Sequence, residues 1–268
     1  MRRFSILHAI PLSFFSGDLY RDVARSWRGI GLAYLLLVVA LLTVTVVIRM
    51  QIALDGFARG EGATGFIEQI PRIVIRHRVV EVDAPMPLVI SDSKTGTELA
   101  IIDTTGQVTS LDGLEAKVLL TADQVHFRKS VAETRVFALS GVKDFTVDSA
   151  RAGRWLNTFS TWASPIAAPF VFVGLGCFRL FQQLLLAVVG LLVGRVLGVR
   201  IDFSAHMRLA AVALTPALIV EPVLDLLRAK PAGWGMLWIA LSIGYMVWAV
   251  RANEAKMVRR EGIEPSTY

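Results

Sequence analysis

Long apolar runs alternate with charged stretches along this chain, and the alternation predicts its elements. The first run covers residues 29–48 and carries no charged residue between Arg28 and Arg49. A bilayer core of about 30 Å needs roughly 20 apolar residues at a helical rise of about 1.5 Å per residue. We therefore predict a first transmembrane helix over residues 29–50.

The segment before this run, residues 1–28, mixes aromatic and basic side chains. On a helix that starts at Asp18, the side chains of Leu19, Val23 and Trp27 share one face. This pattern is typical of an amphipathic helix that lies at the membrane surface, with Trp and Tyr at headgroup level. We predict a cytoplasmic amphipathic segment that orients the first helix; the alternative is a docking surface for a partner.

Residues 51–155 are charged throughout and contain no long apolar run, which predicts a β-rich domain. Glycines within 55–65 indicate a flexible start, and residues 72–82 alternate apolar and polar side chains as one strand does. Residues from about 148 to 155 are predicted to turn helical. Turn signals separate further short runs, predicting mainly antiparallel strands at 88–91, 99–103, 117–120, 125–128 and 134–139.

Residues 155–194 contain one charged residue, Arg179, and allow two topologies. Two spans would need a hairpin at Arg179, where the sequence has only good helix formers and no turn residue. Two spans would also send the later basic residues outside, against the positive-inside rule. Pro165 and Pro169 indicate that a regular helix starts only near them. We prefer one span at about 166–193.

Two further apolar runs predict spans at about 208–227 and 234–250. Residues 156–251 would then form a three-helix membrane bundle, followed by a charged cytoplasmic tail at 252–268. The predicted fold class is membrane α+β: four transmembrane helices with a β-rich extracytoplasmic domain inserted between helices 1 and 2.

Composition and charge agree with a membrane protein. The chain is 54% hydrophobic, above the roughly 45–50% of soluble domains, and its mean hydropathy is +0.57. The net charge of +6 comes largely from basic residues that flank the apolar runs. We predict a multi-pass membrane protein with both termini cytoplasmic, in contact with the lipid bilayer and not with nucleic acid.

Two further exclusions follow from the sequence. The first apolar run is too long, and its charged leader too long, for a cleavable signal peptide. Cys177 is the single cysteine, which excludes an intramolecular disulfide and a cysteine-based zinc site.

Polar side chains inside the apolar runs form the candidate site, because such residues are costly in a bilayer and are often functional. Arg179 is followed one helical turn on by Gln182 and Gln183, and Glu221 and Asp225 share a face of the third span. Pairing of Arg179 with Glu221 would neutralise both charges. The pair would serve either as structural glue or as part of a transport or ligand pathway.

Gly190, Gly194 and Gly198 repeat at a spacing of four residues. Small residues at this spacing let helices approach closely. We predict that this face packs against another span or against a second copy in a homo-oligomer.

Several motifs resemble catalytic signatures but lack their spacing. Residues 103–106 read Asp-Thr-Thr-Gly, one residue longer than the aspartic-protease motif. Ser93 stands where P-type ATPases carry the phosphorylated aspartate, and Lys94 would have to serve two separate motifs of penicillin-binding enzymes. Turns between strands explain these residues, and we predict no catalytic residue.

The histidines also lack a metal-ligand spacing. His77 and His126 lie in predicted strands, and a metal or pH-sensing role for them is the alternative to ordinary strand positions. We predict no metal and no cofactor. The four histidines are His8, His77, His126 and His206.

Short segments point to a known family. They are SFFSGDLY at 13–20, WRG at 27–29, Tyr34, PMPLVI at 85–90 and IIDTTG at 101–106. In these segments, and in the order of one helix, a soluble insert and a membrane bundle, the chain resembles a bacterial integral-membrane family of unknown function. Some members of that family carry a maltodextrin-utilisation label. The resemblance implies a shared architecture and no catalytic residues.

With the location that the resemblance implies, we expect a non-enzymatic, multi-pass protein of the bacterial inner membrane whose extracytoplasmic domain senses, binds or scaffolds an envelope partner or ligand. The alternative is a small transporter or transporter-accessory protein that uses Arg179, Glu221 and Asp225.

Overall fold

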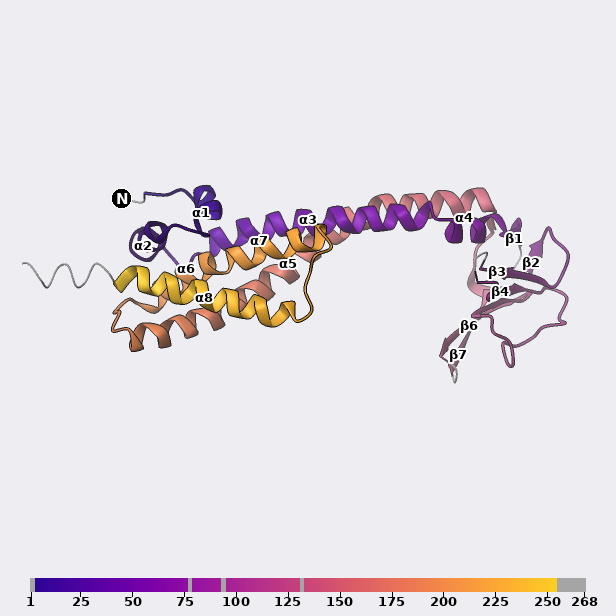
Figure 1. The fold of residues 1–268 in the computed structure, drawn as a ribbon. Coiled ribbons are helices and arrows are strands. Elements are labelled where there is room, and N and C mark those ends of the chain that lie inside the picture. Colours follow the sequence, from indigo (N-terminus) through magenta and orange to yellow (C-terminus); the bar gives the residue numbers. More distant parts are fainter. Residues whose placement is uncertain (1–2, 77–78, 93–94, 131–132, 255–268) are drawn as a thin grey trace, which may run out of the picture. The chain divides into compact units, whose positions relative to one another are not determined.

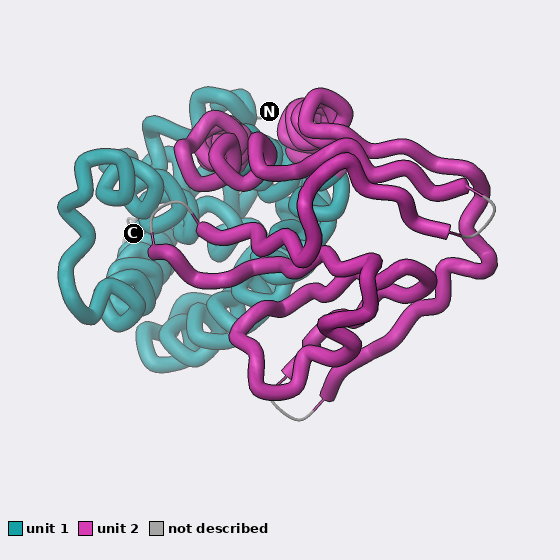
Figure 2. The backbone as a smooth tube through the Cα atoms, turned by 90° about the vertical axis from the view of Figure 1, so that its right-hand side faces the viewer, with its two compact units in different colours: residues 1–47, 167–268 teal, residues 48–166 magenta. Residues whose placement is uncertain are grey.

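The protein folds into two compact units, each with its own core (Figure 2). Unit 1 comprises residues 1–47 and 167–268, and unit 2 comprises residues 48–166. The computed structural model describes residues 3–76, 79–92, 95–130 and 133–254.

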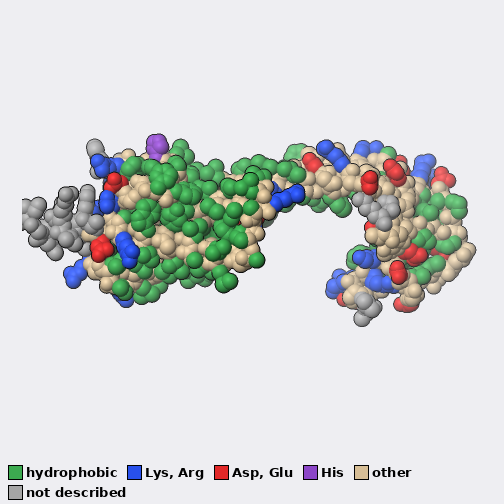
Figure 3. Space-filling model, in the orientation of Figure 1, with side chains coloured by type: hydrophobic (Ala, Val, Ile, Leu, Met, Phe, Trp, Pro, Cys, Tyr) green, Lys and Arg blue, Asp and Glu red, His purple; other side chains and the backbone are tan. Residues whose placement is uncertain are grey.

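Unit 1 is built from helices (Figure 1). Among the described residues, four helical stretches are long and apolar enough to cross a membrane: α3, α5, α6 together with α7, and α8. On the face that Figure 3 shows, hydrophobic side chains cover much of the helices, and charged side chains gather where α2 and the end of α8 lie. The helices are α1 (Ile6–Leu12), α2 (Gly17–Ser26), the first part of α3 (Leu32–Ala58), the last part of α5 (Ser149–Val196), α6 (Phe203–Ala213), α7 (Thr215–Leu226) and α8 (Trp234–Glu254).

The helix α3 differs from its prediction at both ends. It begins at Leu32 and not at residue 29, because Gly29 and Gly31 adopt positive φ angles of 70° and 79° in a turn before it. It continues to Ala58 and is followed by α4 (Glu61–Glu68), so the predicted flexible start of the β-rich domain is wrong.

The helix α5 is continuous over its 48 residues, as in the single-span topology. The Asp148 carboxylate accepts a hydrogen bond from the Arg151 N–H at 2.7 Å and caps its start. The helix runs through Pro165 and Pro169, so the prediction that it starts only near them is wrong. Each proline removes one hydrogen bond, and a long helix retains enough others to continue.

The predicted third span consists of two helices. α6 starts at Phe203, directly after its N-cap residue Asp202, and ends at Ala213. α7 starts at Thr215 with Pro216 in its first turn, where a missing N–H leaves no broken bond. The span predicted at about 208–227 therefore begins earlier, at Phe203, and passes through both helices.

The apolar face of α2 packs into the core of unit 1. Leu19, Tyr20 and Val23 are fully buried, and Trp27 is nearly so. The Tyr20 ring meets Trp248 of α8 edge-on, with 5.1 Å between ring centroids. Tyr20 thus contacts Trp248 of α8, and Trp27 contacts Tyr34 of α3, so both rings pack against protein. Their position at headgroup level stays a prediction.

Arg208 connects α6 to the end of α2. Its side chain is 9% exposed, and its guanidinium donates to the carbonyl oxygens of Val23 (3.1 Å), Ala24 (2.8 Å) and Gly29 (2.8 Å). The last carbonyls of a helix lack partners within the helix, and a positive charge is favourable there. Arg208 therefore stabilises the attachment of α2 to the bundle.

Unit 2 contains two sheets, of order β2-β1-β8 and β3-β4-β5-β6-β7. Neighbouring strands pair antiparallel except β4 and β5, which are parallel. Residues between β4 and β5 help to close one core cluster, which holds Ile101, Leu111, Ala116 and Leu119. The strands are β1 (Ile73–Arg76), β2 (Val79–Val82), β3 (Leu88–Ser91), β4 (Glu98–Ile102), β5 (Val118–Leu120), β6 (Gln124–Ser130), β7 (Glu133–Ala138) and β8 (Phe145–Val147), with a short 3-10 helix at Leu139–Gly141.

The single strand predicted at 72–82 is wrong, because β1 and β2 form a hairpin. Arg76 pairs with Val79, and the chain reverses between them. Residues 77–78 lie outside the described residues. Ile75 and Val80 face each other and are both buried. The alternation of apolar and polar residues did not reveal this reversal of the chain. The available signal was that the inward-facing apolar residues have odd numbers before the turn and even numbers after it.

Candidate functional site

An apolar groove in unit 2 is the first candidate site. It is formed by the last turns of α3, by α4, by β4 to β6 and by the first turns of α5, and its volume is about 960 Å³. Four aromatic side chains that line it are strongly exposed: Phe57 (65%), Phe127 (46%), Trp155 (48%) and Phe159 (61%). Binding pockets are mostly apolar and measure about 300–1,000 Å³. The groove therefore has the size and surface of a binding site.

Two glutamine side chains fix the walls of the groove. Gln51 of α3 donates to the Ser160 carbonyl oxygen of α5 at 2.9 Å. Gln69, at the end of α4, donates to the Ser91 carbonyl oxygen at 2.9 Å and accepts from the Ser91 N–H at 3.0 Å. A preformed site loses less conformational entropy on binding.

The lining of the groove is almost entirely apolar. Apart from Asp92 and the exposed Lys117, its described lining residues are glycines or apolar residues. These two side chains are the charged groups that the described lining offers to a ligand. The arrangement suits a ligand with an apolar body and a polar end.

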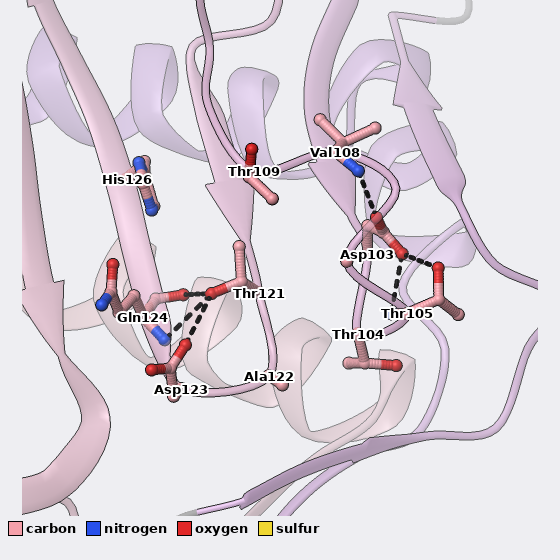
Figure 4. Close-up of a pocket in the computed structure, with 11 residues that line it drawn as sticks. Asp103, Thr104, Thr105, Val108, Thr109, Thr121, Ala122, Asp123, Gln124 and His126 are labelled. Atoms are coloured by element: carbon pink, nitrogen blue, oxygen red, sulfur yellow. Dashed lines mark hydrogen bonds between the residues drawn. The ribbon is translucent and has the colours of Figure 1, made fainter.

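A second cavity of unit 2, of about 320 Å³, lies beside the Asp-Thr-Thr-Gly turn (Figure 4). The fully buried Asp103 accepts hydrogen bonds from the Thr105 N–H (2.9 Å), the Thr105 hydroxyl (2.6 Å) and the Val108 N–H (2.5 Å). Burial alone would raise the pKa of Asp103, but these hydrogen bonds hold it below its usual value. The carboxylate stabilises its own turn, as the sequence pattern suggests.

His126 of β6 lines the same cavity, whereas His77 lies outside the described residues, as do Ser93 and Lys94. Within the part of the chain that the structure describes, no group of three or more His, Cys, Asp or Glu side chains is placed to hold a metal ion. Cys177 is exposed on α5.

The polar residues predicted inside the spans meet in part within unit 1. Arg179 of α5 lies 3.7 Å from the Glu221 carboxylate of α7 and donates to the Gln182 side-chain oxygen at 2.6 Å. Its guanidinium also lies over the Trp238 ring of α8, 5.4 Å from the centroid. One side chain thus contacts three helices, and it is only 12% exposed.

Lys230, in the loop after α7, completes this group and was missed by sequence reasoning. It bridges Glu221 (3.2 Å) and Asp225 (3.4 Å), and hydrogen bonding to Glu221 raises its pKa. Its position just after a span that ends with two acidic residues was the available signal. Arg179 and Lys230 balance the two carboxylates, so the cluster is formally neutral.

Gln183 takes no part in this cluster. It is fully buried and donates to the carbonyl oxygens of Ile30 (2.7 Å) and Met207 (2.9 Å). These contacts connect α5 to α6 and to the turn before α3. Gln183 is therefore a structural residue.

The three glycines have two different roles. A Cβ on Gly190 would come within 1.8 Å of the Met246 methyl group, and one on Gly194 within 3.1 Å of His206. These two glycines pack against α8 and α6 of the same chain, as predicted for one of the two alternatives. Gly198 follows the end of α5 with a positive φ of 70° and nothing within contact distance, so it terminates the helix.

Comparison with curated proteins and with solved structures gives no significant match. A family model described as "Protein of unknown function (DUF1189)" matches residues 7–250, which includes both units in large part. The chain therefore belongs to the DUF1189 family of proteins of unknown function.

Proposed function

We propose that this chain is a non-enzymatic protein of the bacterial inner membrane whose extracytoplasmic domain binds an apolar or amphipathic ligand. The four apolar helical stretches and the basic residues that flank them support a multi-pass location with both termini cytoplasmic. In that orientation the β-rich domain, between the first two spans, lies outside the cytoplasm. A role in maltodextrin utilisation, which the label of some family members suggests, stays a prediction.

The observation that carries this function is the exposed aromatic lining of the groove. Large apolar surfaces left open to water usually mark interaction sites. Phe159 exposes 61% of its surface, which is about 120 Å² if the side chain offers about 200 Å². Covering that area contributes up to about 3 kcal/mol at about 25 cal/mol per Å².

A dansyl-labelled fatty acid tests the groove directly. Full-length protein in nanodiscs is titrated with the probe, and tryptophan-to-dansyl energy transfer is measured against empty nanodiscs. We expect saturable binding that weakens at least about tenfold in Phe127→Ser/Phe159→Ser, since about 1.4 kcal/mol corresponds to a factor of ten. Phe137→Ser is the matched control, because Phe137 is 56% exposed on β7 and does not line the groove. Equal binding by all three proteins would refute the proposal.

The alternative function, a small transporter or transporter-accessory protein, has less support. Arg179 and Glu221 contact each other, and Lys230 bridges Glu221 to Asp225, so their charges are already compensated. A homo-oligomer or a protein partner bound through the membrane helices stays a prediction.

A further inference from the structure

A cavity of about 620 Å³ lies in unit 1 where α5 turns into α6. The turn is a Schellman motif: the Val199 N–H bonds to the Gly194 carbonyl oxygen at 2.9 Å, and the Gly198 N–H to that of Arg195 at 3.4 Å. Gly198 reverses the chain with its positive φ. As a result, Arg195 before the turn and Arg200 after it line one cavity.

The charge in this cavity is positive. Arg195 and Arg200 are both exposed and line it together with one acidic residue, Asp202. Asp202 accepts a hydrogen bond from Ser204, which lowers its pKa, and it lies 3.9 Å from Arg208. Because Arg208 compensates Asp202, two positive charges remain for a ligand.

The remaining walls are apolar. Leu191, Val199 and Ile201 line the cavity, and Val196, beside it on α5, is 86% exposed. A ligand here would meet two guanidinium groups and an apolar surface together. A free anion would bind only the guanidinium groups, whereas a phospholipid would bind them through its phosphate and contact the apolar surface with an acyl chain.

We propose that this cavity binds an anionic phospholipid, with Arg195 and Arg200 holding its phosphate and the adjoining apolar surface contacting an acyl chain. Arginine pairs with phosphate through two parallel hydrogen bonds, and basic pockets at the cytoplasmic ends of spans bind lipid headgroups. The inference requires the membrane location proposed above, but it does not depend on the groove of unit 2.

Lipid titration of the purified full-length protein in detergent micelles tests this assignment. Binding of phosphatidylglycerol, phosphatidylcholine and inorganic phosphate is measured by native mass spectrometry and by the shift in melting temperature. We expect phosphatidylglycerol to bind selectively. Each arginine near a lipid surface contributes about a factor of five, so Arg195→Gln/Arg200→Gln should weaken binding about 30-fold.

Two further variants control for charge and folding. Arg25→Gln/Arg251→Gln removes the same charge from exposed residues that do not line the cavity, and it should bind as the wild type does. Arg195→Lys/Arg200→Lys keeps the charge and should lose less than the glutamine variant. Equal binding of phosphatidylcholine, equal stabilisation by inorganic phosphate, or unchanged binding in the glutamine variant would each overturn the proposal. Absence of the protein from the membrane fraction would instead refute its proposed location.

Discussion

Neutralising one side of the Arg179–Glu221 pair should destabilise the helix bundle more than neutralising both. Glu221→Gln removes the carboxylate partner of the Arg179 guanidinium, which is 12% exposed and also contacts Gln182 and the rings of Phe178 and Trp238. Arg179→Gln leaves Glu221 beside Lys230 at 3.2 Å. We therefore expect Glu221→Gln to be the more damaging single change, and the double variant to recover part of the loss.

The magnitude follows from the geometry. Two charges 3.7 Å apart attract by about 4 kcal/mol at an effective dielectric constant of about 20. Loss of hydration offsets most of this, and Glu221 is still 30% exposed. We expect a coupling free energy of about 1–3 kcal/mol between the two residues.

Thermal unfolding of the purified protein, followed by far-ultraviolet circular dichroism, measures this coupling. Each kcal/mol should change the melting temperature by about 2–4 °C. The exposed Lys129–Glu133 pair is the control, with an expected coupling below about 0.5 kcal/mol. Additive effects of Arg179→Gln and Glu221→Gln would refute the structural role. Loss of solute flux in proteoliposomes without a change in stability would favour the transporter alternative.

Two other substitutions test packing and pH dependence. Gly190→Ala should lower the free energy of unfolding by about 1–3 kcal/mol, because its Cβ would overlap the buried Met246. In a Met246→Ala background the same substitution should change the free energy of unfolding little. Gly244→Ala is the control and should not destabilise the protein, because nothing lies near its Cβ. Asp103→Asn should destabilise unit 2 by about 1–3 kcal/mol at pH 7, measured by chemical denaturation. Because the folded pKa of Asp103 is lowered, its contribution is complete above the unfolded pKa of about 3.9 and is lost as pH falls through the folded value, so the wild type and this variant should converge in acid.

The sequence predicted the strands better than the helix limits. Strand β3 falls on residues 88–91 as expected, since a short apolar run between turn signals has few other solutions. The helix limits failed where the signal was a single residue type. Gly56 lies inside α3 and Pro165 inside α5, because neighbouring residues and capping decide whether a helix continues.

The candidate site was predictable only where charge made a residue conspicuous. Arg179 and Glu221 could be paired from the sequence, because charged residues within apolar runs usually pair with a residue of opposite charge. The groove gave no such signal. Phe159 looks like part of a span, and Phe127 like an ordinary strand residue. Only the folded unit brings the two to one surface.

Two buried polar residues of unit 1, Arg208 and Gln183, donate hydrogen bonds to the turn before α3. A turn within an apolar bundle leaves backbone carbonyl groups without helical partners, which is costly away from water. Arg208 donates to the Gly29 carbonyl oxygen, and Gln183 to that of Ile30. Gly31 allows the close approach, since its Cβ would lie 3.2 Å from the Arg208 Cα. Polarity inside an apolar run is therefore no evidence of a ligand pathway by itself. Gln183 and Arg208 bond to backbone carbonyl groups, and Glu221 compensates the charge of Arg179.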